Sequence, residues 1–137
     1  MHLTVRVDEA RAWVAYSRAI MAEIEALKRA GRLSPVLGSP ADIEDDLQAV
    51  FAAVARLPDG MDEAPLDLSA LRDVERWIYY GRAVWRWLDE LRADGTLATA
   101  PGDGARRFQD QLLGELFEQA SRPPWSWAAA TTDRAAP

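Results

Sequence analysis

The sequence contains no cysteine and only one histidine, His2, which lies next to the first residue. The absence of cysteine excludes disulfide bonds, thiolate metal sites and a cysteine nucleophile. The shortage of histidine removes most imidazole-based catalysis and most transition-metal sites. We therefore expect a protein without a cofactor, and a binding protein sooner than an enzyme.

Long apolar runs are also missing. None approaches the roughly 18–20 residues that cross a bilayer. The first residues lack the charged-then-apolar order of a secretory signal. We expect a cytoplasmic protein that does not contact membranes. Its 137 residues suit one domain with its own core. Residues 1–121 are predicted to form a single helical domain, and residues 122–137 a C-terminal tail.

Acidic residues outnumber basic residues by 22 to 16, so the net charge is −6. Eight of the acids and only one base, Arg56, lie between Ser39 and Asp67. An acidic protein repels phosphate groups, which argues against nucleic acid and anionic membranes as partners. The acidic segment would suit a basic protein partner, although such charge runs more often serve as a solvated face.

Apolar residues recur at steps of three and four, which predicts four helices, at about 8–30, 40–57, 68–94 and 104–121. Asp8 is the expected cap of the first helix. Gly31 and Gly95 follow the first and third helices as stop signals. Connections of roughly ten residues favour an all-α, up-and-down four-helix bundle.

A short extended segment is predicted before the first helix. Leu3, Val5 and Val7 alternate with polar residues, which is the pattern of a strand. One strand cannot form a sheet alone. The segment is therefore predicted to pack as an N-terminal arm, with pairing to a second copy as the alternative.

The helix predicted at 68–94 is apolar over an unusually wide arc. Two adjacent stripes run along it: Leu71, Val74, Ile78, Gly81, Trp85 and Leu88 form the first, and Trp77, Tyr80, Val84, Trp87 and Leu91 the second. A helix with so wide an apolar arc must be covered on more than one side. We expect the cover to be core or a homodimer interface, with a partner-binding surface and a small-molecule pocket as alternatives.

The candidate binding residues come from this helix and from the tail: Trp77, Tyr80, Gly81, Arg82, Trp85, Arg86, Trp87, Trp125 and Trp127. A glycine within a helix costs about 1 kcal/mol relative to alanine. Gly81 therefore indicates a close approach by another element, with Ser17 as the expected crossing point. The tail tryptophans would be costly to leave in water, so they are expected to dock on the bundle or on another chain.

A metal site is the alternative for the helical acids. Four-helix bundles can hold metal ions between inward-facing carboxylates. Glu115 and Glu118 share a helix face, as do Asp42 and Asp45, and Glu75 could join them. Exposed helical acids are the commoner explanation of such pairs.

Three functions follow from these patterns. We expect a non-enzymatic helical interaction module, such as a small acidic adaptor, chaperone-like subunit or inhibitor, that forms a homodimer through the aromatic helix. The first alternative is a magnesium-carboxylate enzyme acting on a phosphorylated small molecule. The second is a bundle whose pocket, lined by Trp77, Tyr80, Trp85 and Trp87, binds an apolar or aromatic ligand.

Overall fold

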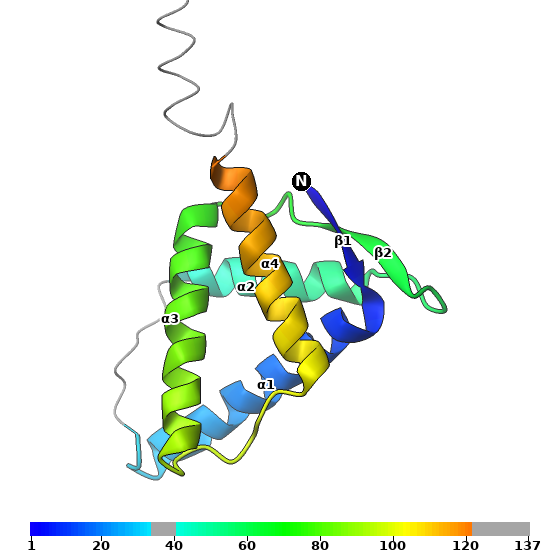
Figure 1. Ribbon diagram of the computed structural model, residues 1–137. Helices are drawn as coiled ribbons and strands as arrows, with labels where there is room; N and C mark the ends of the chain where they lie inside the picture. The colour runs from blue at the N-terminus through cyan, green and yellow to red at the C-terminus, as the bar shows by residue number, and fades with distance from the viewer. Residues whose placement is uncertain (34–40, 122–137) are drawn as a thin grey trace, which may run out of the picture.

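The structure is a computed structural model that describes residues 1–33 and 41–121, with the side chains of residues 1–33 and 44–120. Four helices and two short strands follow one another (Figure 1): β1 (His2–Arg6), α1 (Val7–Arg29), α2 (Ala41–Ala55), β2 (Glu63–Asp67), α3 (Val74–Ala93) and α4 (Asp103–Ser121). The predicted all-α, four-helix fold is confirmed.

The N-terminal segment forms a strand that pairs within the chain. β1 lies antiparallel to β2, with His2 opposite Asp67 and Arg6 opposite Glu63. The predicted extended N-terminal arm is present, but its pairing within the chain was not predicted, because its partner lies in the connection expected between the second and third helices. Exposed acids and Pro65 concealed that strand, although its alternate residues are buried. Proline is tolerated there because a two-stranded sheet has only edge strands.

Two helix starts differ from the prediction. α3 begins at Val74 and not near residue 68, because the Asp73 carboxylate accepts a hydrogen bond from the Arg76 backbone N–H at 3.0 Å and caps the helix there. Asp8 does not cap α1. β1 runs directly into that helix, and Arg6 occupies the cap position without a side-chain hydrogen bond.

Two helix ends match their predicted stop signals. Gly31 and Gly95 have φ angles of 70° and 84°, a conformation that glycine adopts without steric cost. After each glycine the chain folds back: Arg32 N–H donates to the Leu27 carbonyl, and Thr96 N–H donates to the Leu91 carbonyl, both at 2.9 Å. These bonds satisfy carbonyls that a helix end leaves unpaired.

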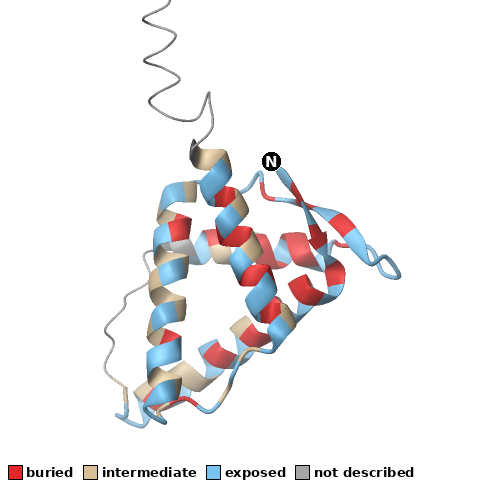
Figure 2. Ribbon diagram, viewed as in Figure 1, coloured by how far each residue is buried: buried red, intermediate tan, exposed pale blue. Residues whose placement is uncertain are grey.

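The core lies where α1 packs against α4 and α2, and α3 stands to one side of it (Figure 2). The Trp13 ring of α1 lies 5.2 Å from the Phe108 ring of α4 and 5.6 Å from the Phe51 ring of α2. Full burial of a side chain of this kind stabilises the fold by about 1.5–3 kcal/mol. α3 is less covered, since only Trp77, Ile78 and Leu88 are buried along it.

Gly81 lies within a continuous α3, where α4 approaches closely. A Cβ atom at Gly81 would lie 3.0 Å from Leu113 Cδ2 and 3.5 Å from Gln109 Nε2. The close approach predicted from the sequence is therefore present. The expected partner was wrong: the neighbour is α4 and not Ser17 of α1, because α4 is the helix that packs against α3 at this point.

Candidate functional site: an aromatic cleft between α1 and α3

A cleft of about 300 Å³ lies between α1 and α3. We call it the aromatic cleft. Four of the six tryptophans and two of the three tyrosines line it: Trp13, Trp77, Trp85, Trp87, Tyr16 and Tyr80. It extends along α1 from Trp13 to Lys28, which corresponds to about four helical turns. The surplus apolar surface of α3 therefore forms one wall of a cleft.

The cleft has a buried floor and more open walls. Trp77 is 6% exposed, and Ile20 and Leu88 are buried beside it. Trp85 and Trp87 are only half-buried, so their rings remain available for contact. An aromatic ring in such a position can add about 0.5–1.5 kcal/mol to a stacked or edge-to-face contact, beyond the burial of area.

A hydrogen-bonded side chain joins three helices beneath the floor. Trp13 Nε1 donates to Gln109 Oε1 at 2.8 Å, and Gln109 Nε2 donates to the Gly81 carbonyl at 3.5 Å. Gln109 is itself buried. This chain of contacts fixes the positions of α1, α4 and α3 relative to one another, and so sets the width of the cleft.

Trp77 lies in the same floor without such a partner. Its Nε1–H group is buried and donates no hydrogen bond to any residue that the structure describes. A buried donor left unpaired costs about 1–3 kcal/mol. The two floor indoles therefore differ: one is tied into the scaffold by a hydrogen bond, and the other is held by packing alone.

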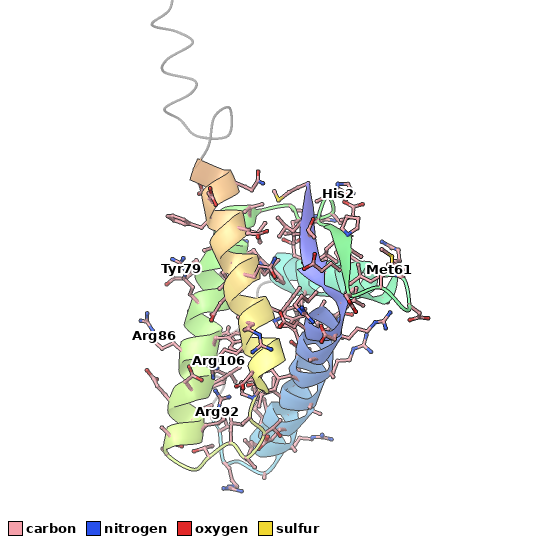
Figure 3. The ribbon with its side chains drawn as sticks, turned by 45° about the vertical axis from the view of Figure 1, so that its right-hand side comes forward. His2, Met61, Tyr79, Arg86, Arg92 and Arg106 are labelled. Atoms are coloured by element: carbon pink, nitrogen blue, oxygen red, sulfur yellow. The ribbon has the colours of Figure 1, made fainter. Side chains whose placement is uncertain are left out.

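A polar cluster supports the wall that Tyr16 and Trp85 form. Arg92 Nη1 donates to the Tyr16 hydroxyl at 2.8 Å, and Asp89 accepts from both Arg92 and Arg106, the latter at 3.0 Å. Figure 3 shows the two arginines close together. The Arg106 guanidinium lies 5.6 Å from the centroid of the Trp85 ring. Burial raises the pKa of Tyr16 although Arg92 opposes it, so the phenol stays neutral at pH 7.

The structure brings five of the nine predicted binding residues together. Trp77, Tyr80, Gly81, Trp85 and Trp87 all line the aromatic cleft. Trp125 and Trp127 lie outside the described residues.

The other two, Arg82 and Arg86, lie on the opposite side of α3. They line a second depression with Glu75, Tyr79 and Phe117, which we call the outer face. Figure 3 shows Tyr79 and Arg86 pointing away from the bundle. Helical periodicity explains the separation, since residues that follow one another along α3 project in different directions.

The acids of the alternative metal site are not brought together. Across the described side chains of residues 1–33 and 44–120, no three or more histidine, aspartate or glutamate residues are arranged to hold a metal ion. Glu75 lies on the outer face. Glu115 accepts a hydrogen bond from Gln111 Nε2 at 3.3 Å. The side chain of Asp42 lies outside the described residues.

Sequence reasoning did not anticipate the α1 wall of the cleft. Trp13, Ser17 and Ile20 follow the three-four apolar spacing that predicts the first helix, and that spacing does not distinguish a core from a cleft. One signal is present in the sequence: Met21 widens the apolar stripe of α1, as the second stripe widens that of α3. Two helices with apolar surplus on facing sides indicate a shared site between them.

No protein family matches this chain, and no curated protein or solved structure matches it. In the part of the chain that the structure describes, no helix combines the length and apolar character needed to cross a membrane. The aromatic cleft and the outer face are the two surfaces from which a function can be inferred.

Proposed function

We propose that this protein binds a small aromatic or other apolar molecule in the aromatic cleft. The observation that carries the proposal is a cleft of about 300 Å³ lined by six aromatic rings. Small-molecule sites usually measure about 300–1,000 Å³, with a mostly apolar lining and a few polar groups. Here the polar groups are Ser17, Gln109 and three charged residues.

The half-buried walls leave apolar surface that a bound ligand would cover. Tyr80, Trp85 and Trp87 each keep part of their surface open to solvent. Covering apolar surface is worth about 25 cal/mol per Å² removed from water. The hydrogen bonds of Gln109 and the polar cluster around Asp89 hold the walls in place before a ligand arrives, which lowers the cost of ordering the site.

Naphthalene is a suitable first probe, since it is flat, apolar and uncharged. We expect saturable binding with one molecule per chain, measured by isothermal titration calorimetry. Ser17→Leu, which adds a branched side chain to the cleft lining, should weaken that binding at least tenfold. Ala15→Leu makes a similar change at an exposed α1 position outside the cleft and should leave binding unaltered.

Thermal unfolding of both variants establishes that they remain folded. The proposal is contradicted if the folded wild-type protein binds no naphthalene up to its solubility limit. Equal binding by wild type and Ser17→Leu would place the site elsewhere and contradict it as well.

A second candidate function, as a protein-interaction module, is favoured by the outer face. Tyr79 is 69% exposed and Phe117 is 53% exposed. The Arg82 guanidinium lies 5.3 Å from the Phe117 ring centroid. Exposed aromatic residues with arginine beside them are common at protein interfaces. In this role the protein would be an acidic adaptor, chaperone-like subunit or inhibitor that forms a homodimer through the outer face, or that contacts a basic partner through the acidic segment between Ser39 and Asp67.

Sedimentation equilibrium tests the homodimer form of this second candidate. A dimer through the outer face should dissociate more readily when Tyr79→Ser removes the exposed ring. A wild-type protein that stays monomeric at all accessible concentrations would exclude it. A dimer of unchanged strength in Tyr79→Ser would place the interface elsewhere.

A further inference from the structure

We infer that the preferred ligand of the aromatic cleft is a flat organic cation, an inference that rests on the proposed function. The faces of aromatic rings carry negative electrostatic potential, and tryptophan attracts cations more strongly than tyrosine or phenylalanine. Four tryptophans line the cleft. One of them, Trp85, already has the Arg106 guanidinium 5.6 Å from its ring centroid. The same chemistry would act on a cation that enters the cleft.

Two carboxylates at the mouth of the cleft favour the same sign of charge. Glu25 of α1 and Glu44 of α2 both line the cleft and are exposed. Neither carboxylate has an ion pair or a hydrogen bond within residues 1–33 and 44–120. No base of that part of the chain therefore forms a close ion pair with either carboxylate.

The remaining charges near the cleft do not reverse this preference. Among the described residues, Lys28 is the only basic residue of the lining, against the two glutamates. Arg92 and Arg106 stand behind the Tyr16 and Trp85 wall, where Asp89 pairs with both and Asp110 adds a second negative charge near Arg106. The net charge of −6 on the chain adds a long-range attraction for cations at low salt. An anion would instead meet repulsion at the mouth.

The rings and carboxylates set the class of ligand. A flat molecule of one or two fused rings with a delocalised positive charge would place its apolar body against Trp85 and Trp87. Its charge would lie over the ring faces and near Glu25 or Glu44. A neutral hydrocarbon of the same shape would gain the burial of area but not the electrostatic attraction.

A pair of probes isolates the charge. 1-Methylquinolinium and 1-methylnaphthalene have the same ring skeleton, and they differ in one ring atom and in charge. We expect the cation to bind at least as tightly as the hydrocarbon, although its desolvation costs more. Binding of both should be lost in Ser17→Leu, which places both in the cleft. Raising the salt concentration should weaken only the binding of the cation.

Charge variants complete the experiment. Glu25→Gln combined with Glu44→Gln should weaken the binding of 1-methylquinolinium about fivefold, which is the effect of one or two screened ion pairs. The binding of 1-methylnaphthalene should not change. Lys28→Gln should strengthen the binding of 1-methylquinolinium. Glu63→Gln combined with Glu90→Gln is the matched control, because it makes the same change in net charge at exposed positions outside the cleft.

The outcomes separate the two claims. If neither probe binds, both the proposed function and this inference are overturned. If the hydrocarbon binds and the cation binds more weakly or not at all, or if the cleft carboxylate variant and its control change the binding of the cation equally, the inference fails while the proposed function stands. A cation whose binding depends on Glu25 and Glu44 supports both.

Discussion

The two sides of α3 carry similar aromatic residues, but they differ in how far neighbouring elements cover them. On the side toward α1, Trp77 is 6% exposed, and Trp85 and Trp87 form the wall of a cleft lined by two glutamates and one lysine. On the outer face, Tyr79 is 69% exposed beside two arginines. The difference arises from the neighbouring elements, because α1 and α2 enclose the inner side and α4 only borders the outer one. A wide apolar arc on a helix is therefore not evidence of a fully covered core.

Gly81 separates the two sides, and its replacement should have the largest effect. Gly81→Leu would force a side chain against Leu113, whose Cδ2 atom lies 3.0 Å from the position of a Cβ. Overpacking of this kind costs about 1–3 kcal/mol or more, and we expect loss of most of the folded population on mild heating. Gly114→Leu is the control, since no atom lies within 4 Å of a Cβ there. Equal unfolding temperatures for the two variants would contradict the packing of α4 on α3.

The two floor indoles should respond differently to the loss of their N–H groups. Trp13→Phe breaks the bond to Gln109 and leaves a buried amide oxygen unpaired, which we expect to cost about 2–3 kcal/mol. Trp77→Phe removes a donor that has no partner among the described residues, so its cost should be smaller by about 1 kcal/mol or more. Urea unfolding measures both. Equal losses would show that packing, and not the hydrogen bond, decides the effect at Trp13.

A third pair of variants compares the sides of α3 directly by ligand binding. Trp87→Ser removes a ring from the cleft wall and should weaken the binding of naphthalene about tenfold, which is roughly 1.4 kcal/mol of binding free energy. Tyr79→Ser removes a ring from the outer face, where it should change neither the binding of naphthalene nor the stability by more than about 0.5 kcal/mol. If both variants weaken the binding of naphthalene equally, the two sides of α3 are not functionally distinct.

The smallest effect concerns the loop between α3 and α4. The Glu23 carboxylate of α1 accepts hydrogen bonds from the backbone N–H groups of Ala98 at 2.8 Å and Thr99 at 3.0 Å. The Ala98 bond is the main reason that the pKa of Glu23 is lowered, and Thr99 adds to it. Because the folded pKa is below the unfolded one, this group stabilises the fold above about pH 4.3. The stabilisation is lost as pH falls through the folded pKa.

Urea midpoints at pH 6 and pH 3 measure this contribution. The wild-type protein should lose slightly more stability than Glu23→Gln between these values. An identical loss in the two proteins would show that the loop contact contributes nothing that depends on pH.

The sequence predicts the helices well because their signals are local. Three-four spacing and the glycines at positions 31 and 95 place α1 and the end of α3 within a residue or two. β2 was missed because Pro65 and acidic neighbours disguise a strand whose partner lies about sixty residues away. Five cleft residues were anticipated from α3 alone. The facing wall was not, because the angle between α1 and α3 depends on how α4 packs on both.

The indole N–H signals of the six tryptophans offer the most direct test of the aromatic cleft. In a ¹H–¹⁵N correlation spectrum we would titrate 1-methylnaphthalene into the full chain and assign each indole signal by a Trp→Phe variant. A ligand in the cleft predicts saturable shifts at Trp85 and Trp87, with smaller shifts at Trp13 and Trp77 beneath them. Shifts confined to Trp125 and Trp127, or no saturable shift at any of the four cleft tryptophans, would contradict the assignment of this cleft as a binding site.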